Sequence, residues 1–287
     1  MKAEQLNKWG VLIFQLSALA VFFGRSWQHL DRGGPYLTLF TNDLLFRPLV
    51  ELFSEMSWSA YIRSSEVATF GKNVGYGMGY FFGIAVIWII LYQWIPRWIN
   101  RLVTIITTIA LFILALTLFQ QQAFRVAQFF EYTCQISTPF LFYHFFYNQI
   151  TKDRLQLLLK IIIALTFISH GLYAIGYYPI PGKFIGMTNR GFGSTDEVSR
   201  LVLLTVGWLD IILSLALFLP LKKIQTASII YMIIWGILTA FARIWANYYH
   251  DLGWYSLNQW IPETIYRFPH FLLPLALLLF SRQDVTK

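Results

Sequence analysis

Long apolar runs, separated by short segments that hold most of the charged residues, dominate this chain. A helix that crosses a bilayer needs about 20 mostly apolar residues, because lipid offers the backbone no hydrogen-bond partner. The runs predict eight such helices, at residues 9–25, 74–95, 102–119, 126–147, 157–178, 200–220, 225–245 and 266–281. The pattern therefore predicts an all-α fold, a polytopic transmembrane helical bundle of about eight spans.

Composition agrees with this interpretation. Of the 287 residues, 57% are hydrophobic and only 13% are charged, whereas soluble domains carry about 25% charged residues. The net charge of +8 could indicate nucleic-acid binding, but the basic residues lie mostly in short loops beside the apolar runs, as in membrane proteins. We therefore expect the lipid bilayer, and no nucleic acid, as a partner. The single cysteine, Cys134, excludes an internal disulfide and a Cys-x-x-Cys redox pair.

Lysine and arginine predict the orientation of the bundle. With eight spans, one side receives Lys2, Lys8, Arg97, Arg101, Lys152, Arg154, Lys160, Lys222, Lys223, Arg282 and Lys287. The loops on the other side hold most of the acids, such as Asp31, Asp43 and Asp251. The positive-inside rule then places both termini in the cytoplasm. The sequence thus predicts a multi-pass protein of the cell inner (cytoplasmic) membrane.

Three local patterns add detail. Residues 41–57 predict an amphipathic helix in the first outer loop, lying on the membrane or capping the bundle, with an apolar stripe of Leu45, Leu49, Leu52, Phe53 and Met56. Gly75, Gly79 and Gly83 recur at a four-residue spacing, which favours close packing against another helix. Residues 194–197 form a capping box that predicts the start of the sixth span.

The chain divides near residue 150 into two halves of four spans each. We expect one domain at 1–150, which contains a long outer loop at 26–73, and a second domain at 151–287. An even number of spans in each half makes this a parallel repeat and not an inverted one.

The second half carries Ile168-Ser169-His170-Gly171 in its first span and Gly207-Trp208-Leu209-Asp210 in its second, which Leu219-Pro220 closes. In these residues the chain resembles the DoxX-like superfamily of membrane proteins, as tandem four-helix halves of which the second is the clearer. Members of that group are similar to subunits of thiosulfate:quinone oxidoreductase and of redox-stress complexes. The resemblance therefore implies a quinone-linked, oxidoreductase-associated role. The first half has no acid at the position that matches Asp210.

Asp210 lies near the middle of its span, where an acid costs about 2.5–3.5 kcal/mol. It is a candidate catalytic residue, as a proton or quinone-carbonyl partner, or else it forms a structural hydrogen bond to a neighbouring helix through a residue such as Ser214. His170 is its candidate partner if their two helices adjoin. The alternative for His170 is a buried core histidine without chemistry.

Charged and histidine side chains at one depth of the outer half of the bundle form a second set of candidates. We expect a ligand-binding group made of Arg25, His29, Glu131, Arg243, Arg267 and His270. Such a group could hold an anionic headgroup, a quinone oxygen or an oxyanion. The alternative for any one arginine is that it extends to the interface without binding anything.

These observations leave three functions open. The chain is a quinone-linked oxidoreductase or a membrane subunit of one, a carrier for a small organic or lipid-like solute, or a non-catalytic scaffold. The first function requires a redox or periplasmic protein partner, because the chain has no visible electron carrier. The cofactor is unknown: a quinone fits the candidate residues, whereas haem is disfavoured, since His170 and His270 are the only pair of candidate axial ligands. No zinc motif is present, so we expect no metal site.

Overall fold

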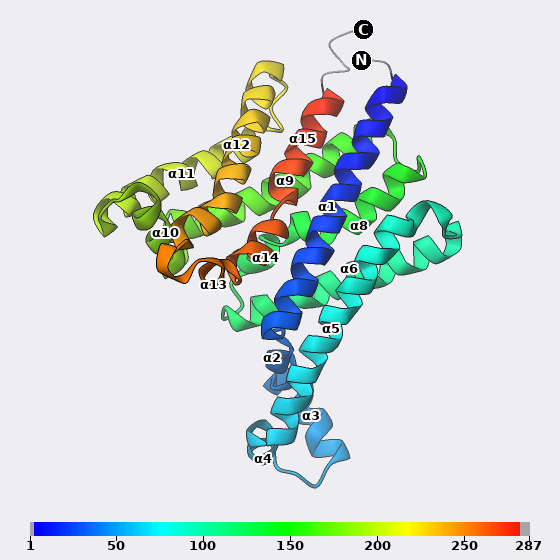
Figure 1. The fold of residues 1–287 in the computed structure, drawn as a ribbon, viewed down its shortest axis with the longest axis vertical. Coiled ribbons are helices and arrows are strands. Elements are labelled where there is room, and N and C mark those ends of the chain that lie inside the picture. The colour runs from blue at the N-terminus through cyan, green and yellow to red at the C-terminus, as the bar shows by residue number, and fades with distance from the viewer. Residues whose placement is uncertain (1–2, 282–287) are drawn as a thin grey trace.

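The computed structural model describes residues 3–281, and every regular element within them is a helix (Figure 1). The helices are α1 (Ala3–Arg32), α2 (Tyr36–Phe40), α3 (Asp43–Phe53), α4 (Trp58–Arg63), α5 (Ser65–Leu91), α6 (Arg97–Gln121), α7 (Val126–Phe130), α8 (Thr133–Phe146), α9 (Lys152–Ala174), α10 (Gly182–Phe192), α11 (Asp196–Ala216), α12 (Lys222–Asn247), α13 (Trp254–Leu257), α14 (Trp260–Ile265) and α15 (Pro269–Ser281), with the short 3-10 helices η1 (Tyr92–Trp94) and η2 (His250–Leu252). The predicted all-α fold is confirmed. Lys2, Arg282 and Lys287, which helped to predict the orientation, lie outside the described residues.

Seven helical segments in the described part of the chain are long and apolar enough to cross a membrane: Lys8–Arg32, Ser65–Trp94, Arg97–Gln121, Lys152–Ala174, Asp196–Ala216, Lys222–Asn247 and Trp260–Ser281. Large apolar side chains cover their outward faces. Ile84, Ile87 and Ile90 of α5, for example, are each more than half exposed. Such faces are stable against hydrocarbon and costly against water, so the helices have the character of a multi-pass membrane protein.

The predicted span at 126–147 is not one continuous helix. α7 ends at Phe130 and α8 begins at Thr133, and the Thr133 hydroxyl donates a hydrogen bond of 2.7 Å to the Phe130 carbonyl at the break. Pro139 within α8 removes a further backbone donor, and the Thr138 hydroxyl donates to the Gln135 carbonyl instead, at 2.9 Å. An eighth crossing is therefore not present as a single helix and stays a prediction.

Helix α1 occupies the middle of the bundle and contacts α5, α8, α14 and α15 (Figure 1). It meets α5 at the predicted glycine positions. A β-carbon on Gly75 would lie 2.5 Å from the Gly34 nitrogen, and one on Gly79 would lie 2.9 Å from the Leu30 side chain. These glycines hold the backbone of α5 against α1 and the turn that follows it, so their predicted packing role is confirmed.

Helix α3 matches the predicted amphipathic helix and lies with α2 and α4 at the end of the molecule away from the termini (Figure 1). The Asn42 side chain caps it by accepting a hydrogen bond of 3.0 Å from the Leu45 amide. Leu52 and Phe53 are 72% and 79% exposed, while Arg47 bonds Glu51 at 2.8 Å on the polar side. The apolar stripe of α3 therefore remains uncovered by the bundle.

Helices α9 to α12 form the part of the fold that encloses the candidate site. α9 and α11 approach closely, since a β-carbon on Gly171 would lie 2.7 Å from the Gly207 carbonyl oxygen. Residues 217–221 join α11 to α12, and α10 contacts both helices (Figure 1). Arg190 of α10 donates a hydrogen bond of 2.7 Å to the Asn247 side chain at the end of α12. The Thr195 hydroxyl accepts from the Val198 amide at 3.4 Å, which confirms the predicted start of α11.

Candidate functional site

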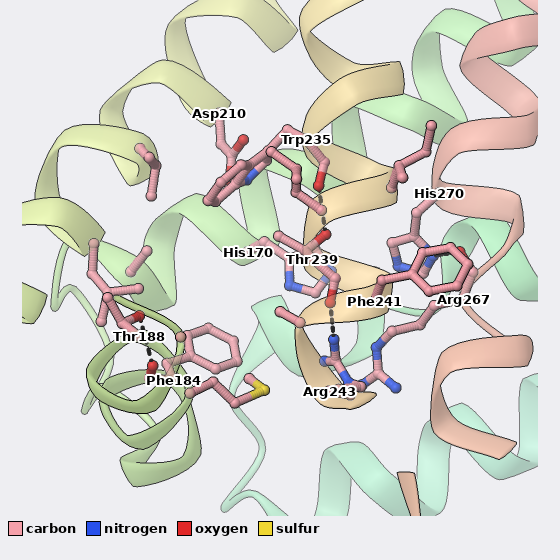
Figure 2. A pocket seen from close by; sticks show the side chains of 18 of the residues that line it. His170, Phe184, Thr188, Asp210, Trp235, Thr239, Phe241, Arg243, Arg267 and His270 are labelled. Carbon is pink, nitrogen blue, oxygen red and sulfur yellow. Dashed lines mark hydrogen bonds between the residues drawn. The ribbon is translucent and has the colours of Figure 1, made fainter. Parts of the chain in front are cut away.

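A cavity of about 460 Å³ lies among α9, α10, α11 and α12, with the beginning of α15 at its side (Figure 2). Most of its wall is apolar and includes Phe167, Phe184, Met187, Leu203, Val206 and Phe241. Leu238 and Trp245 also line it, and they are 54% and 75% exposed on the outward face of α12. The cavity therefore reaches the apolar surface of the bundle, and an apolar molecule could enter it from lipid.

Five of the residues predicted from the sequence line this one cavity, namely His170, Asp210, Arg243, Arg267 and His270. They come from four different helices and from the segment between α14 and α15, and Figure 2 shows them around a common space. The other three predicted residues, Arg25, His29 and Glu131, are buried but do not belong to the cavity wall. The fold thus separates the predicted ligand-binding group into two adjoining parts.

The first part is a polar end of the cavity formed by Arg243, Arg267 and His270, each no more than 4% exposed. His270 Nδ1 lies 2.9 Å from the Arg267 carbonyl oxygen. A carbonyl oxygen can only accept, so Nδ1 carries the hydrogen and Nε2 offers its lone pair. His270 Nε2, Arg243 Nε and Arg267 Nε are all buried without a hydrogen-bond partner. The polar end thus contains one acceptor and two donors without a hydrogen-bond partner in the protein, one of which, Arg243 Nε, lies in an ion pair.

Two carboxylates balance these arginines. Glu263 Oε2 lies 3.4 Å from Arg243 Nε and 3.4 Å from Arg267 Nη1, and Glu131 Oε1 lies 3.7 Å from Arg267 Nη2. Glu131 also accepts a hydrogen bond of 3.2 Å from the Gln128 amide. The break between α7 and α8 therefore places a carboxylate from the first half of the chain against an arginine from the second.

The second part surrounds Arg25, which is 2% exposed. Its Nη2 donates to Gln135 Oε1 at 2.6 Å and its Nη1 donates to Gln28 Oε1 at 2.8 Å. The guanidinium lies 3.7 Å from the centre of the Tyr266 ring and 5.2 Å from that of Tyr132. Arg267 lies 4.8 Å from the same Tyr266 ring. The two cations therefore contact the same aromatic ring, and glutamine oxygens rather than a carboxylate bond Arg25.

His29 faces away from the cavity, towards α2. Its Nδ1 lies 2.7 Å from the Arg25 carbonyl oxygen and so donates to it, and the Tyr36 hydroxyl donates to its Nε2 at 3.4 Å. Burial raises the pKa of Tyr36, so this hydroxyl keeps the proton that it donates. Both ring nitrogens of His29 are thus engaged within the protein, which gives the residue a structural position.

Asp210 belongs to the cavity wall but does not form the expected hydrogen bond with His170. Its Oδ1 accepts from the Tyr231 hydroxyl at 2.8 Å and its Oδ2 lies 3.3 Å from the Trp235 indole nitrogen, both on α12. The His170 ring is instead next to His270, with ring centroids 5.5 Å apart. α9 and α11 do adjoin, as the pairing requires, but their close glycine contact leaves the Asp210 side chain turned to α12.

Several residues of the site, among them Glu263, Tyr231 and Gln135, were not predicted from the sequence. Glu263 lies four residues before Arg267, a spacing that places both on one helix face, but residues 246–265 fall between two predicted spans. Tyr231 and Gln135 are ordinary residues of apolar spans, and no spacing rule connects them with Asp210 or Arg25. Only Glu263 had a signal that could have identified it.

The chemistry of the site follows from its charges. Two buried arginines of the cavity wall, Arg243 and Arg267, pair with the carboxylates of Glu131 and Glu263, and Asp210 adds a carboxyl group to the same wall. The nitrogen atoms of Arg243 and Arg267 that lack a hydrogen-bond partner favour a ligand with an anionic group or an electron-rich oxygen. Within residues 3–281, histidine, cysteine and carboxylate side chains form no group of three that could hold a metal ion. Comparison with known proteins adds no assignment, since no family model, curated protein or solved structure matches the chain.

Proposed function

We propose that this protein binds a lipid-soluble quinone in the cavity among α9, α10, α11 and α12 and serves as the membrane subunit of a quinone-linked oxidoreductase. The observation that carries the proposal is the polarity of that cavity. Its walls are apolar and reach the outward surface at Leu238 and Trp245, and at its inner end Arg243, Arg267 and His270 each keep one buried nitrogen atom without a hydrogen-bond partner. The resemblance of its second half to DoxX-like proteins also favours a quinone-linked role.

A quinone matches this arrangement in each of its parts. The hydrocarbon tail of a quinone would lie along the apolar wall and leave towards lipid between α10 and α12. A quinone carbonyl accepts hydrogen bonds, which Arg243 and Arg267 can donate. A quinol hydroxyl donates one, which His270 Nε2 can accept. The site therefore offers partners to both the oxidised and the reduced headgroup.

The proposed role requires a second protein. Oxidation of a quinol to a quinone releases two electrons and two protons, and the chain has one cysteine and no dithiol to take the electrons. We infer that they pass to or from a partner subunit that carries a flavin, haem or iron–sulfur centre. The protons have nearer acceptors, because His270 and His170 both line the cavity.

The proposed topology completes this account. α7 and α8 together would form an interrupted eighth crossing, which gives two halves of four crossings at 1–150 and 151–287. Both termini would then lie in the cytoplasm and the protein in the inner membrane. The pairing of Glu131 with Arg267 supports an eighth crossing, because it draws the break between α7 and α8 to the depth of the cavity.

Quinone binding can be measured by equilibrium dialysis of a short-chain benzoquinone against the protein in lipid nanodiscs, with empty nanodiscs as the blank. Leu238→Trp would obstruct the cavity mouth, while Leu201→Trp makes the same change at an exposed residue of α11 outside the cavity. His270→Asn removes the acceptor, and His144→Asn makes the same change on α8.

The wild type and the two control variants should bind saturably, with about one quinone per chain. Leu238→Trp and His270→Asn should bind about tenfold more weakly or worse, which is the scale of one lost hydrogen bond or of an obstructed site. Absence of saturable binding to the wild type, or equal binding by all five proteins, would overturn the proposal.

The buried arginines favour a second candidate, a carrier for an anionic lipid-like solute. Arg25 has no carboxylate partner, and Glu263 is shared between Arg243 and Arg267. Uptake of radiolabelled dodecylphosphonate into proteoliposomes, compared with protein-free liposomes, tests this function. Uptake that Leu238→Trp abolishes and Leu201→Trp does not would support a carrier, and uptake equal to that of protein-free liposomes would exclude it for this solute.

A further inference from the structure

Two serine hydroxyls beyond Asp210 have no hydrogen-bond partner, although both residues are fully buried. Ser214 on α11 and Ser228 on α12 are each 0% exposed, and neither side-chain oxygen meets a donor or acceptor of the protein. Buried serines elsewhere in the bundle behave differently. Ser17 on α1 is equally buried, and its hydroxyl donates at 2.8 Å to the Ile13 carbonyl of its own helix.

The two serines lie on the same side of the Tyr231–Asp210 hydrogen bond. The Tyr231–Asp210 hydrogen bond fixes how α11 and α12 face each other, and the short connection at 217–221 makes the two helices run in opposite directions. Ser214 follows Asp210 by four residues, and Ser228 precedes Tyr231 by three. With a rise of 1.5 Å per residue, Ser214 lies about 6 Å along α11 from Asp210 and Ser228 lies about 4.5 Å along α12 from Tyr231, both on the side of Lys222.

The polar positions continue from these serines to the cavity. Ser228, Tyr231, Trp235 and Thr239 recur on α12 at intervals of three and four residues, so they share one face of the helix. Tyr231 and Trp235 bond the Asp210 carboxylate, and Trp235, Thr239 and Asp210 line the cavity (Figure 2). These α12 side chains, with Asp210 and Ser214 of α11, therefore form a polar seam that extends from the cavity towards Lys222.

Hydroxyls in such a position need partners. An unsatisfied buried hydroxyl costs about 1–3 kcal/mol, and the common solution in proteins is a buried water that makes about three hydrogen bonds. Two orphan hydroxyls, each about one helical turn from the Asp210–Tyr231 pair, supply polar partners that such a water requires. Hydroxyls, water and a carboxyl group within a membrane bundle are also the groups that relay protons.

We propose that this seam is hydrated and conducts protons between Asp210 and the end of the bundle at Lys222. A proton arrives on water at Ser214 and Ser228, binds the Asp210 carboxylate, and leaves it for a group in the cavity, so the seam returns to its starting state. The groups that face Asp210 are Tyr231 and Trp235 of α12 and, across the cavity, His170, Arg243, Arg267 and His270. The inference extends the proposed function by naming the route of its protons, but the hydration of the seam can be measured without a quinone.

Hydration is tested by replacing each serine with cysteine in a Cys134→Ser background and measuring its modification by silver ions in vesicles. Silver reacts with the thiolate, which forms only where water can take the proton. The matched control is Ser17→Cys, which is equally buried but lies at a hydroxyl site already satisfied by the protein. Silver is added from one side of the membrane at a time.

We expect Ser214→Cys and Ser228→Cys to react about tenfold faster than Ser17→Cys or more, because their thiols can ionise. Reaction should be faster from the side that holds Lys222. Reaction at the slow rate of Ser17→Cys, or faster reaction from the opposite side, would overturn the proposal. Since this assay contains no quinone, its failure is distinguishable from a failure of quinone binding.

The relay is tested by the carboxylic-acid carbonyl band of Asp210 in infrared difference spectra, assigned by its loss in Asp210→Asn. A pH jump on the Lys222 side should change this band about tenfold more slowly in a Ser214→Ala, Ser228→Ala double variant than in Ser17→Ala, because the relay groups are lost. A band that responds equally fast in both proteins would show that protons reach Asp210 by another route.

Discussion

His170 and His270 lie with their ring centroids 5.5 Å apart, although one belongs to α9 and the other to α15. The sequence indicated a different partner for His170, the carboxyl group of Asp210. In the structure Asp210 instead accepts hydrogen bonds from Tyr231 and Trp235, and both histidines line the cavity beside Arg267. The cavity consequently has an acidic wall on α11 and a basic, histidine-rich end on α12 and α15.

The shared carboxylate of Glu263 should be important for stability. Glu263→Gln leaves Arg243 and Arg267 with only Glu131 to balance them, and loss of one partner of a buried ion pair costs about 3 kcal/mol. We expect a clear decrease of the thermal unfolding temperature in detergent. Glu51→Gln is the control, because its pair with Arg47 is about half exposed and should contribute less than about 1 kcal/mol. Equal effects of both changes would contradict the importance of this ion pair.

The contact of α9 with α11 should not tolerate a methyl group. In Gly171→Ala the new β-carbon would lie 2.7 Å from the Gly207 carbonyl oxygen, and such overpacking costs about 1–3 kcal/mol. Gly77→Ala makes the same change in α5, where no atom lies within 4 Å, and it should stabilise the protein by up to about 1 kcal/mol through helix propensity. The unfolding temperatures of the two variants should therefore move in opposite directions, and a common direction would contradict this packing.

Arg25 should not be replaceable by lysine. Its guanidinium donates to two glutamines while it stacks on Tyr266, which the compact ammonium group of lysine cannot do. Arg25→Lys should lower the unfolding free energy by about 2 kcal/mol. Arg47→Lys on the exposed side of α3 should change it by less than about 0.5 kcal/mol. The unfolding free energies of both variants can be compared by thermal unfolding under one set of conditions. An Arg25→Lys variant as stable as the wild type would show that only the positive charge is required.

The fold was predictable where one physical rule acts within one segment. Apolar length identified seven of the helices, and the glycine spacing at 75–83 identified the face of α5 that meets α1. The interruption of 126–147 was not predictable in this way, because hydropathy does not register backbone breaks. The sequence does contain Glu131, Pro139 and the threonines that bond nearby carbonyls. The position of the break, however, is tied to the pairing of Glu131 with Arg267, which joins distant parts of the chain.

The sequence predicted which buried charged residues belong to the candidate site, but it did not predict how they are arranged in space. Burial of charge identified Arg25, Arg243 and Arg267, which the structure brings close together around Tyr266 and Glu263. The partner of Asp210 was not predictable, since it depends on the register between α11 and α12. That register is fixed by long-range packing, which a single sequence does not display.

The most direct test of quinone binding in the cavity is mass spectrometry of the small molecules that the purified protein retains. We expect the wild type to carry a quinone-type lipid and the Leu201→Trp control to carry the same amount. We further expect Leu238→Trp, with its cavity mouth obstructed, to carry little or none. A wild type that retains no such lipid, even after incubation with a long-chain quinone, would contradict the assignment of the cavity, as would equal retention by Leu238→Trp.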